Sequence, residues 1–124
     1  MLVAVAAVVL LLVGAALEVW AVIELGWRRA FELSDAPPDP AMAHLVFRGP
    51  FRFVRHPQSL GLLLILAGTA LAVQAPLMWL LAVIAGGFVV AMAVRDDREL
   101  ARRFGAAYGR YREAVPLLLP WSAR

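Results

Sequence analysis

The stretch FRGPFRFVRHPQSLG, from Phe47 to Gly61, interrupts a strongly apolar chain. It places three arginines, a histidine and two prolines directly before an apolar run that begins at Leu60. Gly49-Pro50 is a turn signal, and Pro57 suits the first position of a helix, where a missing N–H costs nothing. His56 then lies at or just before the N-cap. We call this stretch the hinge, and it predicts a stiff, basic entry into a helix.

The composition of the 124 residues indicates one small membrane protein domain. Hydrophobic residues make up 63% of the chain, which is more apolar surface than a small soluble domain can bury. The absence of cysteine excludes disulfides, thiolate metal sites and cysteine nucleophiles. The positive charges are all arginines that flank apolar runs, so the net charge of +3 predicts topology signals at a bilayer and no nucleic-acid partner.

Three apolar runs predict an all-α fold, a polytopic membrane protein with about three transmembrane helices. The first run, residues 1–25, is long enough to cross about 30 Å of hydrocarbon, with a signal peptide as the alternative. The second, residues 57–73, is marginal in length, and the third is residues 76–94. The tight turn QAP, residues 74–76, joins the last two into a hairpin. Glycines 61, 68, 86 and 87 fall in this hairpin and predict close helix packing.

The arginines gather on one side of the predicted spans. The loop of residues 26–56 and the tail of residues 95–121 are rich in arginine, whereas the N-terminus and the QAP turn have none. By the positive-inside rule, the loop and the tail are cytoplasmic and the N-terminus is outside. We expect this topology in a bacterial inner membrane.

The tail predicts a cytoplasmic amphipathic helix. Asp96 and Asp97 would begin it, where acids suit the helix dipole, and Pro116 would end it. Gly105 and Gly109 would soften it. Its apolar stripe at helical spacing consists of Leu100, Phe104, Tyr108, Tyr111 and Val115, with most tail arginines lying off this stripe.

The start of the second span offers a first candidate site. The free N–H groups of Gln58, Ser59 and Leu60 would suit a carboxylate or a phosphate, and Arg55 adds positive charge. The alternative is a pair of arginines that reach lipid phosphates beside the His56 cap.

Acidic residues offer two more candidates. Asp96 and Asp97 either cap a helix and pair with nearby arginines, or face a cationic or hydroxyl-rich ligand. Glu18 is a carboxylate inside a span, which is costly and marks a functional hypothesis. It would either pair with an arginine of the loop or the tail, or be protonated and packed against another span. No His/Glu cluster at ligand spacing points to a metal.

The order of these motifs resembles a known family. HLVFRGPFRFVRHPQSLG, residues 44–61, precedes a hydrophobic hairpin and then DDRELARRFGAAYGRYREAVPLLLP, residues 96–120. This combination resembles the isoprenylcysteine carboxyl methyltransferase and phospholipid methyltransferase superfamily of integral membrane enzymes that use S-adenosylmethionine. The resemblance covers roughly residues 18–121 and rests on the ordered combination, since Arg-His-Pro alone is a weak signal.

The resemblance implies cofactor contacts in the hinge, just before it, and in the acidic pair. Phe51 and Ser59 stand where the family has tyrosines, and the pair is Asp96 and Asp97 where the family has glutamates. One member of that pair is implied to bind the cofactor. The implied cofactor-binding residues are Ala43, His44, Leu45, Val46, Phe51, His56, Pro57, Gln58, Ser59, Asp96 and Asp97, and the candidates for a catalytic role are Arg55, His56 and Arg95.

The resemblance also implies a reaction. A methyl group would pass from S-adenosylmethionine to a lipid-soluble or membrane-presented acceptor, which is a carboxylate, an amine or a thiol. Such a transfer needs alignment and a deprotonated nucleophile more than a metal. The alternative is a non-catalytic membrane protein that keeps the fold as a binding or assembly module. The chain looks short at its N-terminus beside many family members, so a homo-oligomer is one way to complete the substrate side.

Overall fold

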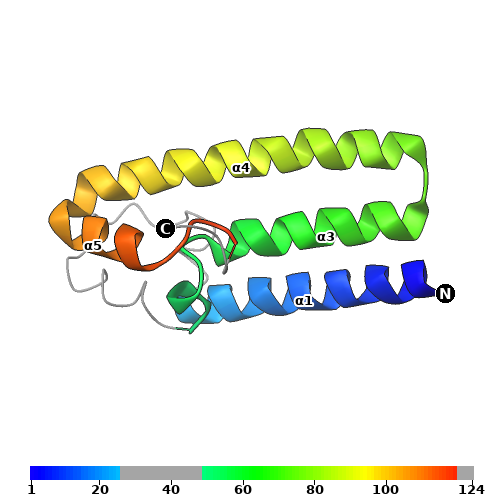
Figure 1. Cartoon of the computed structure of the whole chain (residues 1–124), viewed down its shortest axis with the longest axis horizontal. Helices are drawn as coiled ribbons and strands as arrows, with labels where there is room; N and C mark the ends of the chain where they lie inside the picture. Colours follow the sequence, from blue (N-terminus) through cyan, green and yellow to red (C-terminus); the bar gives the residue numbers. More distant parts are fainter. Residues whose placement is uncertain (26–48, 120–124) are drawn as a thin grey trace.

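A computed structural model describes residues 1–25 and 49–119, and these residues form helices and connecting turns, without strands. The long helices are α1 (Leu2–Leu25), α3 (Pro57–Val73) and α4 (Pro76–Phe104). A short 3₁₀ helix, η2 (Gly49–Arg52), precedes α3, and α5 (Ala106–Ala114) follows α4. Successive long helices run in opposite directions, and η2 and α5 gather at the end of the bundle opposite the N-terminus (Figure 1). The predicted all-α class is confirmed for these residues.

Local signals fix the turn between α3 and α4. Pro57 and Pro76 occupy the first turns of the two helices. Gln74 ends α3 with a left-handed φ of 58°, and its backbone N–H donates to the carbonyl of Ala70 at 2.9 Å. Its side-chain amide donates to the carbonyl of Leu71 at 2.9 Å, which helps to offset the cost of a left-handed residue other than glycine.

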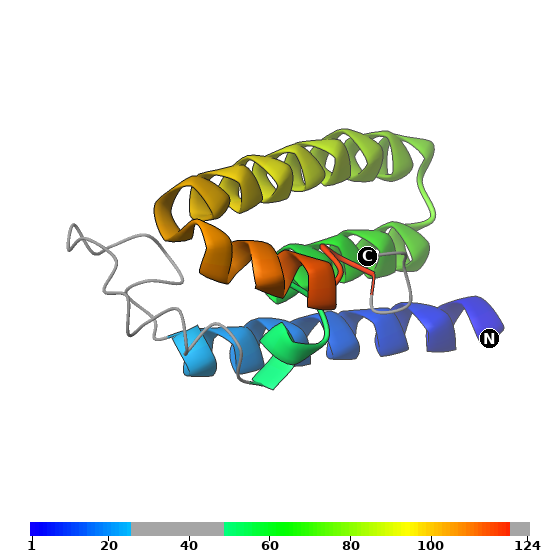
Figure 2. The ribbon, with the colours of Figure 1, turned by 60° about the vertical axis from the view of Figure 1, so that its left-hand side comes forward.

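Within residues 1–25 and 49–119, two helices are long and apolar enough to cross a membrane, namely α1 and α4. Only 11% and 6% of their apolar windows are buried against the rest of the described protein, so lipid is the natural cover for these surfaces. α3 has 17 residues and measures about 26 Å at about 1.5 Å per residue, slightly less than a hydrocarbon core. Figure 2 shows α3 lying between α1 and α4.

The helix α4 continues through the predicted start of the tail helix. The expectation that Asp96 and Asp97 begin a new helix is wrong, because both lie inside α4, which ends only at Phe104. No proline or glycine interrupts residues 88–104, so nothing in the local sequence stops the helix there. The break comes at Gly105, whose φ of 58° and ψ of −131° are readily adopted only by glycine.

The closest packing joins α1 to α3 and depends on small residues. A Cβ atom on Gly14 would lie 2.7 Å from the backbone oxygen of Gly61. A Cβ atom on Gly68 would lie 2.9 Å from the side chain of Leu11. The two backbones can approach only because these side chains are absent.

The four glycines expected in close helix packing divide into two groups. Gly61 and Gly68 pack against α1, not against α4. Gly86 leaves 3.3 Å between an added Cβ atom and Leu63, and Gly87 meets nothing within 4 Å. Close helix packing is thus confirmed for Gly61 and Gly68, whose partner is α1, and is wrong for Gly87, which faces open space.

A leucine at position 14 should separate α1 from α3. Gly14→Leu places a side chain where even a Cβ atom meets backbone at 2.7 Å, and we expect a loss of about 1–3 kcal/mol of stability. Gly87→Leu is the matched control, because it adds the same side chain to open space. Thermal unfolding in detergent micelles measures both variants, and equal melting temperatures would contradict the packing described here.

Candidate functional site

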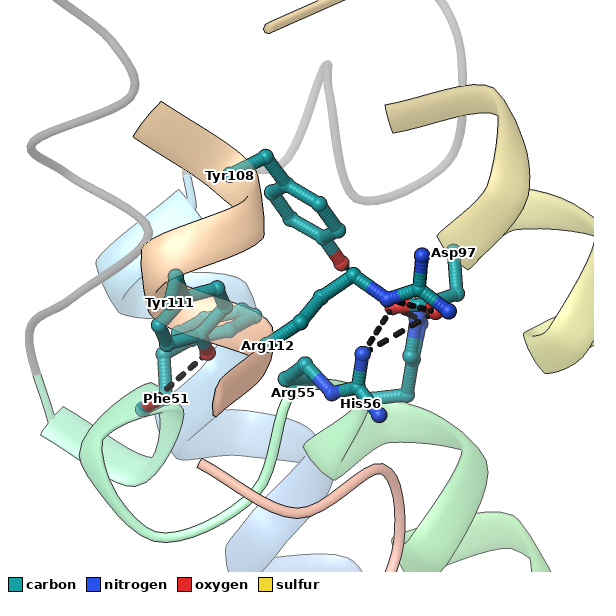
Figure 3. Close-up of polar contacts among 7 residues, drawn as sticks. All are labelled: Phe51, Arg55, His56, Asp97, Tyr108, Tyr111 and Arg112. Atoms are coloured by element: carbon teal, nitrogen blue, oxygen red, sulfur yellow. Dashed lines mark hydrogen bonds and ion pairs between the residues drawn. The ribbon is translucent and has the colours of Figure 1, made fainter. Parts of the chain in front are cut away.

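Backbone hydrogen bonds join the hinge to the chain that follows α5. The N–H group of Arg55 donates to the carbonyl of Pro116 at 2.9 Å, and the N–H group of His56 donates to the carbonyl of Leu117 at 3.1 Å. These bonds join residues far apart in the sequence. They leave the side chains of Arg55 and His56 directed toward the end of α4 (Figure 3).

The carboxylate of Asp97 is the centre of the contacts between hinge and tail (Figure 3). Its side chain is 5% exposed. The Nη1 atom of Arg55 donates to both carboxylate oxygens, at 2.9 and 3.0 Å, and the Tyr108 hydroxyl donates to Oδ1 at 2.7 Å. The Nε atom of Arg112 lies 3.1 Å from Oδ2, and His56 Nε2 lies 3.7 Å from Oδ1. We call these five residues the Asp97 cluster.

The Asp97 cluster explains how an acid can be buried at the end of the bundle. A carboxylate removed from water is costly unless charges and hydrogen bonds replace its hydration. Two guanidinium groups and a phenol do so here. Two positive charges against one negative charge leave the cluster with one surplus positive charge, without counting His56.

Two buried tyrosines complete the junction. Their rings meet edge to face, with centroids 5.6 Å apart, and the Tyr111 hydroxyl donates to the backbone oxygen of Phe51 at 2.6 Å. Burial raises the pKa of Tyr108, and the hydrogen bond to Asp97 and its negative charge raise it further. Burial also raises the pKa of Tyr111, although the nearby charge of Arg55 opposes this. Both hydroxyls therefore stay protonated and act as donors.

An apolar cluster holds α5 in place beneath these polar contacts. Tyr108, Tyr111 and Val115 are buried and pack against Leu100, Ala101 and Phe104. The residues of the predicted stripe do gather on one side. Leu100 and Phe104 belong to α4, however, Tyr108 and Tyr111 belong to α5, and Val115 follows α5. The expectation of one amphipathic helix through Gly105 is therefore wrong.

The structure gathers part of the predicted site. Arg55, His56 and Asp97 converge, whereas Arg95 is exposed and Asp96 is half-buried. Neither Arg95 nor Asp96 forms an ion pair with a residue that the structure describes. Of the other predicted residues, Phe51 and Pro57 are buried, Gln58 and Ser59 are half-buried in the first turn of α3, and Ala43, His44, Leu45 and Val46 lie outside the described residues.

The start of α3 has fewer free donors than expected. The N–H group of Leu60 donates to the carbonyl of His56 at 3.1 Å, so the prediction that it is free is wrong. The N–H groups of Gln58 and Ser59 precede this first helical bond. The His56 side chain makes no capping bond, and its buried Nε2 has no hydrogen-bond partner among the described residues.

Sequence reasoning missed two members of the Asp97 cluster. The sequence predicts Tyr108 only as part of an apolar stripe, and Arg112 only as one of the tail arginines that lie mostly off it. The two are four residues apart, which places a hydroxyl and a guanidinium group on the same face of α5. That spacing could have indicated a shared acidic partner, although it does not tell which acid.

Comparison with known proteins identifies the family of this chain. The profile of the phospholipid methyltransferase family matches residues 2–107. The chain therefore belongs to the phospholipid methyltransferase family, and the resemblance found in the sequence is confirmed. No solved structure matches the chain significantly.

Two curated relatives are methyltransferases. Methanethiol S-methyltransferase 2 of Bradyrhizobium diazoefficiens is 37% identical over 76 residues, which cover 60% of this chain and 29% of the relative. Methanethiol S-methyltransferase of Mycobacterium tuberculosis is 34% identical over 82 residues, which cover 66% of this chain and 31% of the relative. The matched segments thus span less than a third of each relative.

Removing the charge of Asp97 should release α5. Asp97→Asn leaves two guanidinium groups without their shared anion, and breaking a buried pair costs about 3–5 kcal/mol. We expect the lower end of this range, because the Arg112 side chain is 45% exposed. Unfolding in detergent and hydrogen exchange across α5 measure the effect. Asp96→Asn is the control, and a similar loss in both variants would contradict the central role of Asp97.

The tyrosines should resist ionisation while the protein is folded. The chain has two tyrosines, both with a pKa raised above 10.0, so their ultraviolet absorbance reports on this junction alone. We expect little tyrosinate in the folded protein at about pH 10, where free tyrosine is half-ionised. Because the unfolded state releases these protons first, the contribution of the two tyrosines to stability should be constant below about pH 10 and fall above it. Half-ionisation at pH 10 before unfolding would contradict their burial.

Proposed function

We propose that this chain is an integral membrane methyltransferase that transfers a methyl group from S-adenosylmethionine to a lipid-soluble or membrane-presented acceptor. The observation that carries the proposal is the junction of the α3 start with the Asp97 cluster, at one end of an apolar helix bundle in a chain of a methyltransferase family. We further propose that α1, α3 and α4 are three spans, with the hinge and α5 on the cytoplasmic side.

The chemistry of the junction suits the carboxylate of S-adenosylmethionine. The Asp97 cluster has a surplus positive charge, and the N–H groups of Gln58 and Ser59 lie next to it at the start of α3. The buried Nε2 of His56 has no hydrogen-bond partner among the described residues, so it is a third candidate donor. When bound, S-adenosylmethionine supplies a methyl group on a positively charged sulfur.

The two aspartates then have different roles. Asp97 is saturated by donors from the protein, so we assign it to fastening the hinge. Asp96 is half-buried and pairs with no described residue, so we assign it to the ammonium group or the ribose hydroxyls of the cofactor. Positioning of donor and acceptor can supply much of the rate of a methyl transfer.

We propose a small apolar thiol as the methyl acceptor. Both curated relatives above are named for methanethiol, a molecule that dissolves readily in a bilayer. A carboxylate or an amine remains the alternative acceptor class that assays should include. This chain matches less than a third of each relative, so the acceptor needs a direct test.

Binding of S-adenosylhomocysteine, the demethylated product, tests the cofactor assignment. We expect calorimetry on detergent-solubilised protein to detect binding, and His56→Ala and Asp96→Ala each to weaken it by about tenfold. A lost hydrogen bond to a charged group costs about 1.5–3 kcal/mol, which corresponds to tenfold or more. Glu18→Gln should bind nearly as well as the unmodified protein, because Glu18 packs below the start of α3 against Gly61.

The same experiment can reject the proposal. No binding at millimolar ligand would support the non-catalytic membrane protein instead. Equal weakening in all three variants would indicate general destabilisation and would remove the specific roles given to His56 and Asp96.

A further inference from the structure

Glu18 is a carboxylic acid within a predicted span, and it faces another helix instead of lipid. It lies one turn after Gly14 on the face of α1 that packs against α3. A Cβ atom on Gly61 would lie 2.9 Å from Glu18 Oε1 and 3.2 Å from Glu18 Cγ. The missing side chain at position 61 therefore leaves the space that the carboxyl group of Glu18 occupies.

The Glu18 carboxyl group is incompletely bonded. The side chain of Gln58 and the backbone of Leu62 are its polar neighbours on α3. Its Oε1 atom is nevertheless buried and accepts no hydrogen bond of ordinary geometry from a described residue. No described arginine or histidine forms an ion pair with it, so the predicted arginine pairing is not found among these residues.

An unpaired acceptor at this depth costs stability, so its presence indicates a function. Buried polar atoms without partners cost about 1–3 kcal/mol, and ionisable groups inside spans usually serve a function. Gln58 connects Glu18 to the proposed cofactor segment, since it belongs to the first turn of α3 and faces Glu18. Gly61 lies four residues after Pro57, so the carboxyl group lies about 6 Å deeper than the helix start.

We propose that Glu18 accepts the proton of the thiol during methyl transfer, which makes it a catalytic residue of this chain. The proposal rests on the methyltransferase function proposed above. The Oε1 atom is buried, whereas the residue as a whole is half-buried. The proposal therefore has an acceptor dissolved in the bilayer reach the exposed part of the Glu18 side chain without crossing the polar end of the bundle.

The reaction balances with the groups named. The S–H bond of the thiol breaks and its proton passes to a Glu18 carboxylate oxygen, and the sulfur electron pair attacks the methyl carbon of the sulfonium donor. A new S–CH₃ bond forms while the bond from the methyl carbon to the donor sulfur breaks, giving a thioether and a neutral donor sulfide. Glu18 then returns the proton to water.

This role also selects among acceptor classes. A carboxylate acceptor would be repelled by Glu18 in surroundings of low dielectric constant, where like charges interact strongly. A thiol approaches uncharged and becomes nucleophilic only when its proton leaves. The position of Glu18 therefore favours a neutral thiol over a carboxylate.

The test separates binding from transfer in the full chain. Glu18→Gln and the matched control Glu24→Gln, on the same helix, are compared with unmodified protein for S-adenosylhomocysteine binding and for dimethyl sulfide formation from methanethiol. We expect both variants to bind within about twofold of the unmodified protein. Glu18→Gln should lose roughly 100-fold in transfer rate at neutral pH, the size of a general-base effect, and Glu24→Gln little.

The pH profile distinguishes proton transfer from packing. Above the pKa of the thiol, the thiolate forms without help from a protein base. The difference in transfer rate between Glu18→Gln and the unmodified protein should therefore shrink as pH rises. Glu18→Asp, which keeps the acid, should recover part of the activity at neutral pH.

Four results would overturn the proposal. Two concern the transfer rate of Glu18→Gln, which would be equal to that of the unmodified protein or reduced by the same factor at every pH. The third is loss of S-adenosylhomocysteine binding in Glu18→Gln alone, and the fourth is an unmodified protein that binds S-adenosylhomocysteine but does not methylate methanethiol. In the last case the cofactor assignment stands, whereas an unmodified protein without binding would reject the proposed function itself.

Discussion

The buried carboxylate of Asp97 is the interaction on which the end of the bundle opposite the N-terminus depends (Figure 1). The acid reaches its partners only if the hinge and α5 both fold against the end of α4, because Arg55 comes from the first and Tyr108 and Arg112 from the second. Each of these elements is short, and neither could bury the charge alone. The backbone bonds from Arg55 and His56 to the chain after α5 follow from the same arrangement. A single charge therefore sets where α3 begins relative to α4.

The rest of the bundle is held by a different kind of contact. Gly14 and Gly61 let α1 and α3 approach until their backbones touch, whereas α4 packs less closely and exposes most of its apolar surface. In a bilayer the lipid covers that surface, so the hydrophobic effect does not draw α4 toward its neighbours. Van der Waals packing between the apolar helix surfaces is then what holds it there. The polar junction at one end then does what apolar packing does not, which is to fix the position of α4 beside α3.

The parts of this structure that depend on nearest neighbours along the chain could be predicted. Pro57 starts α3 and the QAP turn ends it, because proline and a left-handed residue act within one turn. The sequence predicts only a softened helix at Gly105, whereas the structure ends α4 there. A glycine within a periodic pattern can either bend a helix or end it, and tertiary contacts decide which of the two occurs. The partners of Asp97 could not be predicted, because they lie 42 and 11 residues away and depend on how three elements meet. For the same reason the sequence did not show which member of the acidic pair faces inward.

Asp97 and Glu18 show that burial alone does not separate a carboxyl group with a structural role from one that is available for proton transfer. The number of hydrogen-bond donors around each carboxyl group separates them. Both carboxyl groups are removed from water within the same small bundle. Asp97 has donors on both oxygens, so a proton or a ligand could reach it only by displacing arginine or tyrosine. Glu18 has an oxygen that no described donor occupies, beside a glycine that leaves room for it. The first acid is therefore suited to hold a fixed geometry. The second has the free acceptor that its proposed role, proton exchange with a molecule that enters from the membrane, requires.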